Sequence, residues 1–258
     1  MPAKSEIKLL DLKLPSAAEH LAADEALLDW CETGEGGETL LFWEPRETFV
    51  VVGYANKVAT EVNVAACEAK RIPIFRRCTG GGTVVQMPGG LNYSLILRIA
   101  EKSPTQNITS ANQFIMEKNR AAIEAAIKNL EPDAEIAVNG HTDLTLVTRH
   151  PSPVVFQKFA GNSQRRRKNF LLFHGTLLLD CDLALVSELL PMPSKQPCYR
   201  NDRAHSDFVT NLNLPDEKVK AALAKEWNAN EELKNPPLEE ISRLAREKYA
   251  AREWNFKF

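Results

Sequence analysis

The sequence has no long apolar run, and this absence bears on where the protein works. Residues 1–15 alternate charged residues with leucine and never form the apolar stretch of a signal peptide. No later segment approaches the roughly 18 apolar residues that a membrane-spanning helix needs. We therefore expect a cytoplasmic protein that does not insert into a membrane.

An excess of charge of either sign is absent as well. The formal net charge is -2, with 26% charged and 44% hydrophobic residues. This balance predicts no general attraction to nucleic acid or to a membrane surface. The composition also excludes a disordered chain, a collagen-like repeat and a coiled coil, and 258 residues can bury a sizeable core.

The sequence also has no CxxC pair. Its five cysteines are odd in number and widely scattered, which argues against a disulfide framework and against a zinc ribbon. A reducing compartment fits this pattern best. The cysteines are Cys31, Cys67, Cys78, Cys181 and Cys198.

The apolar patterns predict strands and helices without a regular strand–helix–strand alternation, which indicates an α+β fold with a mixed sheet. Ser16 caps a helix over 17–31, and Ser110 caps a helix over 111–130 that ends at Pro132. A hairpin is expected around residues 80–90. A shorter helix is expected over 63–70, and Pro236 and Pro237 divide a helical C-terminal segment of about 215–258 into two helices. The predicted strands are 8–14, the two adjacent strands 39–43 and 48–52, then 72–75, 91–99, 144–147, 154–160 and 170–179.

Two arginines directly precede three glycines in the run Arg76-Arg77-Cys78-Thr79-Gly80-Gly81-Gly82. Glycines let a ligand approach main-chain N–H groups, and guanidinium forks suit carboxylate or phosphate. The run therefore predicts an anion site, although similar glycine runs also form ordinary tight turns.

Lys158 stands at the end of an apolar strand, before a turn and the basic run 165–168. It fits either a charge that guards an edge strand or a positioned cation. The basic run is typical of a solvated loop, and it could also bind RNA or an acidic protein. His174 fits a core histidine or a catalytic one.

Three polar residues of the first helix, His20, Asp24 and Glu25, are interpreted as members of its solvated face.

In order and spacing, these pieces resemble lipoate-protein ligase A, in the biotin/lipoate ligase superfamily. The resemblance spans roughly residues 8–258. It is carried by Leu21-Ala22-Ala23-Asp24-Glu25, Val51-Val52-Gly53, Arg76 to Gly82, Leu91-Asn92, Asp143-Leu144, Lys158 to Gln164, His174-Gly175-Thr176-Leu177-Leu178, Thr210-Asn211-Leu212 and Trp254-Asn255.

The resemblance implies a class II synthetase-like catalytic domain over 1–258, without the small C-terminal accessory domain of longer relatives. It also implies ATP- and Mg²⁺-dependent activation of lipoate or octanoate to an acyl-adenylate. The acyl group would then pass to a lysine of an apo lipoyl domain, in a 2-oxoacid dehydrogenase E2 subunit or in the glycine cleavage H protein. A separate accessory protein could be required for activation, or the chain could be complete as it stands.

The same resemblance assigns roles to residues of this chain. Lys158 would be catalytic, through its charge, at the carbonyl and phosphate oxygens. Asp143 and Thr83 would join Lys158 on the nucleotide side, with Asp143 near the metal. The residues that would bind lipoate or its adenylate are Arg77, Thr79, Gly80, Gly81, Gly82, Gln86, Asn92, Gly161, His174, Gly175 and Thr176.

Three positions depart from the pattern of the family. Gln86 stands where many relatives carry histidine, Thr142 where they carry asparagine before the Asp-Leu pair, and Gly90 where they carry asparagine. These departures motivate one alternative, a non-catalytic protein that binds an acyl group or a nucleotide. Lys158 and both arginines are retained, which argues against it.

The nearest alternative is an octanoyltransferase or amidotransferase of the same fold, which moves an acyl chain through a cysteine thioester without ATP. Such relatives carry the cysteine about fifteen residues before the family lysine. Residues 140–149 contain none, so we expect the ATP-dependent ligase. A biotin ligase is disfavoured because its glycine signature differs, and RNA binding because interleaved aromatic residues are missing.

Overall fold

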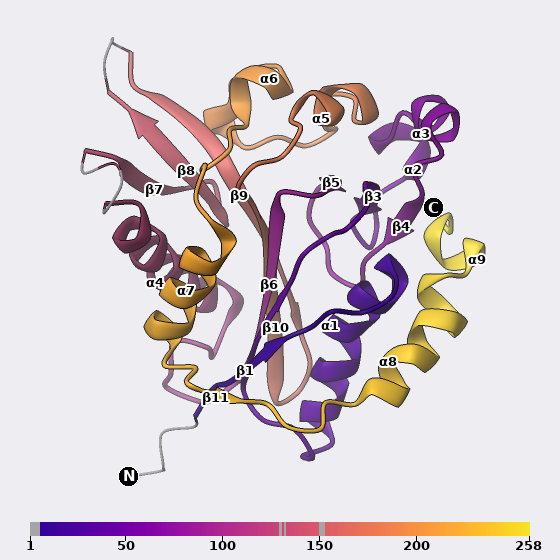
Figure 1. Ribbon diagram of the computed structural model, residues 1–258, viewed down its shortest axis with the longest axis vertical. Helices are drawn as coiled ribbons and strands as arrows, with labels where there is room; N and C mark the ends of the chain where they lie inside the picture. The colour runs from indigo at the N-terminus through magenta and orange to yellow at the C-terminus, as the bar shows by residue number, and fades with distance from the viewer. Residues whose placement is uncertain (1–5, 129–130, 132, 150–152) are drawn as a thin grey trace.

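The computed structural model describes residues 6–128, 131, 133–149 and 153–258, and it confirms the α+β fold with a mixed sheet (Figure 1). Eight strands form the main sheet in the order β11-β1-β2-β6-β10-β9-β8-β7, and a second sheet has the order β4-β3-β5. The strands are β1 Lys8–Asp11, β2 Thr39–Trp43, β3 Phe49–Val52, β4 Ile74–Arg76, β5 Val84–Gln86, β6 Gly90–Arg98, β7 Glu135–Asn139, β8 Asp143–Thr148, β9 Val155–Arg166, β10 Phe170–Leu178 and β11 Glu231–Glu232.

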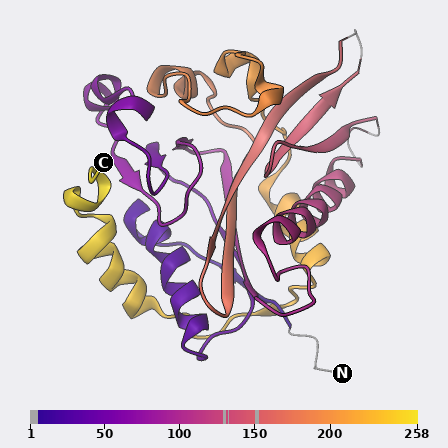
Figure 2. The same ribbon diagram turned by 180° about the vertical axis from the view of Figure 1, so that it is seen from behind.

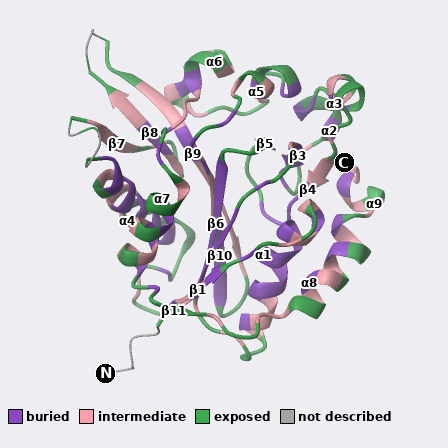
Figure 3. Ribbon diagram, in the orientation of Figure 1, coloured by how far each residue is buried: buried purple, intermediate pink, exposed green. Residues whose placement is uncertain are grey.

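Helices cover both faces of the main sheet (Figures 1 and 2). One apolar core joins the sheet to α4 and α7, and another joins the opposite face to α1 and the C-terminal helices. Both cores appear as buried ribbon in Figure 3. The helical segments are α1 Ala17–Glu32, α2 Val58–Glu61, α3 Val64–Lys70, α4 Ile108–Lys128, α5 Ala184–Leu189, η1 Cys198–Arg200, α6 His205–Phe208, α7 Asp216–Trp227, α8 Leu238–Leu244, η2 Ala245–Tyr249 and α9 Arg252–Asn255.

Helix α1 begins where the sequence predicts, because the Ser16 side chain accepts a hydrogen bond from the Glu19 N–H at 3.2 Å. The interpretation of its polar residues was wrong. Asp24 and Glu25 are only 3% and 4% exposed, and His20 is buried too. Because α1 lies between the sheet and the C-terminal helices, it has no broad solvated face.

The hairpin predicted around residues 80–90 does not form. In the small sheet, β3 lies between β4, which is parallel to it, and β5, which is antiparallel to it. The glycine run, Arg76 to Gly82, therefore leads the chain from one side of β3 to the other. The strands β2 and β3 are likewise not partners, since they lie in different sheets. The glycine run is therefore a connection between β4 and β5 and not a hairpin turn.

Strand β9 is longer than its sequence predicts. It continues to Arg166 and pairs with β10 on one side and β8 on the other, so Lys158 lies within the strand and not at its end. The residues Arg165 and Arg166 also belong to the strand, which corrects the prediction of a solvated basic loop. Pairing on both sides satisfies the hydrogen-bonding N–H and C=O groups of the backbone even where the side chains are small and polar.

Helix α4 begins at Ile108, earlier than predicted. The cap is the side chain of Asn107, which accepts a hydrogen bond from the Ser110 N–H at 2.9 Å. The predicted end at Pro132 lies outside the described residues. No helix in the described ranges combines the length and the hydropathy that a membrane crossing requires.

Glu25 joins three distant parts of the chain. Its carboxylate contacts Lys248 Nζ at 2.5 Å, Arg165 Nη1 at 3.3 Å and the Tyr249 hydroxyl at 2.9 Å. Burial alone would raise the pKa of this carboxyl, but the hydrogen bond from Lys248, its charge and the remaining partners lower the pKa below its usual value. Glu25 is therefore an ionised link between α1, β9 and the C-terminal helices.

We expect Glu25→Gln to lower the free energy of unfolding by about 3 kcal/mol at neutral pH, because it leaves two partly buried cations, Lys248 and Arg165, without the carboxylate that pairs them. The folded pKa lies below the unfolded value of about 4.3, so the stabilisation is present above that pH and is lost as the pH falls through the folded pKa. Urea titrations at neutral and acid pH should show the difference from wild type shrinking in acid. Glu35→Gln, on the surface, is the control. A difference that stays constant with pH would contradict this account.

Candidate functional site

Two rows of side chains cross the main sheet on the face that carries α1. Directly paired residues of neighbouring antiparallel strands point to the same face, so the register alone brings these residues together. The first row is Trp43, Asn92, Thr176, Gly161 and Asp143, and the second is Leu41, Ser94, His174 and Ser163. The sheet thereby assembles Asn92, Gly161, His174, Thr176 and Asp143 as the resemblance implies.

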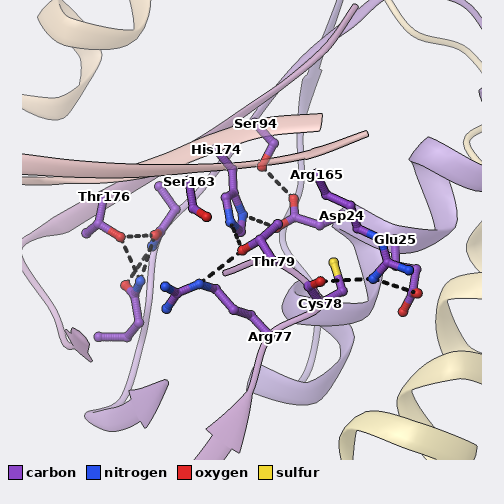
Figure 4. A network of polar contacts seen from close by, with 12 residues as sticks. Asp24, Glu25, Arg77, Cys78, Thr79, Ser94, Ser163, Arg165, His174 and Thr176 are labelled. Carbon is purple, nitrogen blue, oxygen red and sulfur yellow. Dashed lines mark hydrogen bonds and ion pairs between the residues drawn. The ribbon is translucent and has the colours of Figure 1, made fainter. Parts of the chain in front are cut away.

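The glycine run lies over these rows (Figure 4). Ser163 donates its hydroxyl to the Gly80 carbonyl at 3.0 Å, and the Thr79 Oγ1 to His174 Nε2 distance is 2.7 Å. On the other side of the run, the Tyr54 N–H donates to the Thr79 carbonyl at 2.8 Å. The candidate site therefore lies between the main sheet and the connection from β4 to β5.

The two arginines of the run do not present free forks to a ligand. Arg77 Nη2 donates to the carbonyls of Gly80 and Gly82, at 2.5 and 2.7 Å, and Arg77 Nε donates to Thr79 Oγ1 at 3.0 Å. Burial lowers the pKa of the Arg77 guanidinium to about 10, so it remains a cation at neutral pH. Ligand binding by Arg77 stays a prediction, because in this structure its donors serve the protein's own loop.

Arg76 is fully buried and has a structural role. Its guanidinium donates to the carbonyls of Gly53, Tyr54, Asn56, Trp254 and Asn255. This arginine attaches the C-terminal segment to the small sheet that carries the glycine run.

The exposed part of the run is Gly80 to Gly82. Gly81 has a φ of +85°, which favours glycine. Gly80 and Gly82 have no heavy atom within 4 Å of the position that a Cβ would take. Packing within the described chain therefore does not require glycine at these two positions, and close approach of a ligand remains a physical reason for it.

Lys158 points over the sheet because of a β-bulge. Thr145 of β8 pairs with Lys158 while its neighbour Leu144 pairs with Ala160, so β9 has one extra residue at this point. The Lys158 ammonium, with 28% of the side chain exposed, lies 2.8 Å from Asp143 Oδ1. A Cβ on Gly161 would lie 2.8 Å from Lys158 Nζ, so glycine at 161 leaves space for the ammonium.

Tyr199 completes this cluster, and no motif in the sequence singled it out. Its hydroxyl donates to Asp143 Oδ2 at 2.8 Å. Burial and the Asp143 charge raise the pKa of this phenol well above its usual value, so it stays protonated and donates. One carboxylate oxygen of Asp143 therefore contacts Lys158, and the other accepts the hydrogen bond from Tyr199.

A metal role for Asp143 stays a prediction. No group of three or more His, Cys, Asp or Glu side chains within the described ranges is arranged to hold a metal ion. Thr83, also assigned to the nucleotide, lies on the outer side of the glycine run, where its hydroxyl is 3.4 Å from Asn56 Nδ2. A nucleotide role for Thr83 likewise stays a prediction.

His174 connects the rows to α1. Its Nδ1 lies 2.6 Å from Asp24 Oδ2, and Ser94 donates its hydroxyl to the other oxygen of Asp24. The Arg77 Nε–H can only donate, so Thr79 Oγ1 accepts that bond, and its own proton remains available for the contact with His174 Nε2. His174 therefore lies between the carboxylate of Asp24 and the hydroxyl of Thr79.

Gln86 fits the site without a titratable group. Its amide exchanges two hydrogen bonds with the Asn92 amide, each 2.9 Å, and its Nε2 also donates to the Thr176 hydroxyl at 2.7 Å. The departure from histidine at this position therefore gives a closed amide cluster.

Gly175 is required for packing, because a Cβ there would lie 1.7 Å from Asn162 Oδ1.

No cysteine occupies an activated position in the rows. Cys78 is buried beside the glycine run, and burial raises the pKa of its thiol to about 11. Burial likewise raises the pKa of Cys181 to about 11, of Cys31 to about 12 and of Cys67. Cys198 is the exposed one.

Two solved structures define the class of fold. The chain matches a bipartite lipoate protein ligase from Thermoplasma acidophilum with a TM-score of 0.77 and 24% identity, covering 98% of this chain and 97% of that one. It matches lipoate-protein ligase A bound with ATP with a TM-score of 0.72 and 23% identity, covering 97% and 98%. Both likenesses confirm the predicted ligase-type catalytic fold.

The chain belongs to the family of lipoyl protein ligase A/B catalytic domains, which matches residues 16–227. Curated relatives cover nearly its whole length. Octanoyltransferase LipM of Geobacillus kaustophilus is 29% identical over 99% of both chains, and octanoyltransferase LipM of Bacillus subtilis is 28% identical over 98% of this chain and 99% of its own.

These relatives correct the expected activity. The ATP-dependent, adenylate-forming lipoate ligase predicted from the sequence is wrong, because these curated relatives, which are 28–29% identical over nearly the whole of both chains, are named octanoyltransferases. The motifs that carried the resemblance occur throughout the superfamily, so they identified the fold and not the acyl donor. The octanoyltransferase alternative fits these relatives better.

The contacts of His174 give a direct prediction. Because Nδ1 faces Asp24 Oδ2 at 2.6 Å, we expect the ring to carry a proton on Nδ1 and to donate it to the carboxylate. ¹⁵N NMR of labelled histidine rings can assign the tautomer, with His174→Gln identifying the signals and the exposed His141 as the reference ring. A His174 ring with its proton only on Nε2 would contradict this expectation.

Proposed function

We propose that this protein is an acyltransferase that moves an octanoyl group from a carrier-protein thioester to a lysine of an apo lipoyl domain. The observation that carries the proposal is the match to named octanoyltransferases over almost the whole of both chains. An acyl thioester is already activated for attack, so this transfer needs no adenylation step.

The geometry supports the chemistry of such a transfer. When an amine or another nucleophile attacks a thioester carbonyl, negative charge develops on the carbonyl oxygen. The Lys158 ammonium is partly exposed above Gly161 and fixed by Asp143, which is itself held by Tyr199. We assign Lys158 the role of stabilising that charge, which it can do before and during the reaction without moving far.

Membership of the lipoyl protein ligase A/B family supports one class of acceptor. An apo lipoyl domain of a 2-oxoacid dehydrogenase E2 subunit, or the glycine cleavage H protein, would present the acceptor lysine. That lysine must lose its proton to attack. A lipoyl group is the second candidate acyl chain, because the matching folds include lipoate ligases. Binding of ATP or Mg²⁺ and the need for an accessory protein stay predictions.

An assay with two donors tests the proposal. The protein is incubated with apo lipoyl domain and either octanoyl carrier protein without nucleotide, or free octanoate with ATP and Mg²⁺. Intact mass of the lipoyl domain and pyrophosphate release are measured. We expect octanoylation in the first mixture and no pyrophosphate in either. Modification that requires free acid and ATP, or no modification in either mixture, contradicts the proposal.

Gly161→Ala provides a local test. The new methyl group would meet the far end of the Lys158 side chain at 2.8 Å, so the ammonium must move while the fold loses little. We expect transfer to fall by at least about 100-fold, as it would in Lys158→Ala, with the thermal midpoint nearly unchanged. Lys168→Ala, on the surface, is the control. Wild-type turnover in Gly161→Ala and Lys158→Ala would refute the role of the ammonium.

A further inference from the structure

The chain Asp24–His174–Thr79 has the arrangement of an activated hydroxyl. Asp24 Oδ2 lies 2.6 Å from His174 Nδ1, and His174 Nε2 lies 2.7 Å from Thr79 Oγ1. A carboxylate beside one ring nitrogen of a histidine and a hydroxyl beside the other are the parts of a general-base-assisted nucleophile, in which the histidine takes the hydroxyl proton. Sequence order does not matter for this constellation, because it is defined by geometry and roles.

The position of Arg77 also supports Thr79 as an activated hydroxyl. Its Nε donates to Thr79 Oγ1 at 3.0 Å, and this bond uses one lone pair of the oxygen and leaves the hydroxyl proton available for His174 Nε2. A neighbouring cation also favours the oxygen as negative charge builds on it during proton loss. The hydroxyl therefore has a base on one side and a stabilising cation on the other.

The neighbouring thiol is in the opposite situation. Burial raises the pKa of Cys78 to about 11, and the side chain that hydrogen-bonds with its sulfur is Tyr249 and not a histidine. At neutral pH the thiolate fraction is small, so Cys78 is a poor nucleophile although it stands next to Thr79 in the sequence.

Main-chain donors lie directly after Thr79. Within the described part of the chain, no hydrogen bond uses the N–H groups of Gly80, Gly81 or Gly82. N–H groups next to a nucleophile are suited to hold the oxygen of a tetrahedral intermediate. Thr79 itself is 1% exposed beneath these exposed glycines, so the proposal requires this stretch of glycines to move aside for a thioester to reach it.

We propose that Thr79 is the catalytic nucleophile of the transfer and that the acyl group passes through a Thr79 ester before it reaches the acceptor lysine. The inference rests on the proposed octanoyl transfer. It names the residue that would replace the thiol expected about fifteen residues before Lys158 in transferases of this fold.

The two half-reactions balance. Thr79 Oγ gives its proton to His174 Nε2 and bonds to the thioester carbonyl carbon; the carbon–sulfur bond breaks, and the departing sulfur takes the proton from His174. In the second step the neutral acceptor amine attacks the ester carbon, and the carbon–oxygen bond breaks. Thr79 Oγ regains a proton from His174, which takes it from the attacking nitrogen. Asp24 stabilises the transient imidazolium in both steps.

The test uses the protein with octanoyl carrier protein and no acceptor, quenched in acid and measured by intact mass. We expect one octanoyl group, mapped to Thr79 by peptide sequencing. An oxygen ester resists neutral hydroxylamine and is released by alkaline hydroxylamine, whereas a thioester is released at neutral pH. Thr79→Ser should retain the adduct.

Thr79→Val keeps the shape of the side chain and removes the hydroxyl. It should show no adduct, and transfer to the lipoyl domain should fall by about 1,000-fold or more. Thr60→Val makes the same change at an exposed position of α2 and should match wild type. Thr79→Cys keeps the question answerable if valine impairs folding, because it should convert the adduct into one that neutral hydroxylamine releases.

Three outcomes would overturn the inference. Wild-type transfer without any adduct in a single turnover, full activity of Thr79→Val, or an adduct on a cysteine of the wild-type protein each excludes a Thr79 ester. All three leave octanoyl transfer itself intact. Failure of the wild-type protein to modify the lipoyl domain overturns the proposed function instead, so the two failures are distinguishable.

Discussion

A buried guanidinium needs a partner for each of its N–H groups, and the candidate site is built around two that meet this requirement with main-chain carbonyls. Arg76 binds the carbonyls of Gly53 and Asn56, which follow β3, and that of Asn255 near the C-terminus. Arg77 binds carbonyls of the glycine run that follows it. These bonds hold the run over the sheet while its glycines remain exposed. The two guanidinium groups, which the sequence pattern suggested for ligand binding, therefore hold the loop in place.

The register of the main sheet supplies the other half of the site. Strict pairing aligns Asn92, Thr176 and Gly161 in one row, and the single irregularity in β9 turns Lys158 toward them. Asp143 and Tyr199 then fix the ammonium. A cation held over a glycine beside a glycine-rich backbone loop is suited to a reaction in which charge develops on a carbonyl oxygen. This chemistry agrees with acyl transfer from a thioester.

Local patterns predicted much of the fold, because they depend on neighbours in the chain. The Ser16 cap, the strands on either side of the glycine run and the mixed sheet follow from periodicity and turn residues. The burial of Asp24 and Glu25 could not be predicted in this way, since their partners His174 and Lys248 are distant in the sequence. The bulge at Lys158 and the hydrogen bond from Tyr199 to Asp143 likewise depend on tertiary contacts. Shared family motifs also could not distinguish a ligase from a transferase, and the activity expected from them was wrong.

The central claim is that the acyl group arrives as a thioester. The most direct measurement is a single turnover with excess protein, in which an isotope-labelled octanoyl group on carrier protein is chased with apo lipoyl domain after all nucleotide has been removed enzymatically. The account predicts that the label reaches the acceptor lysine as an amide at the same rate with and without nucleotide removal. Label that stays on the carrier protein until ATP is restored would contradict the account.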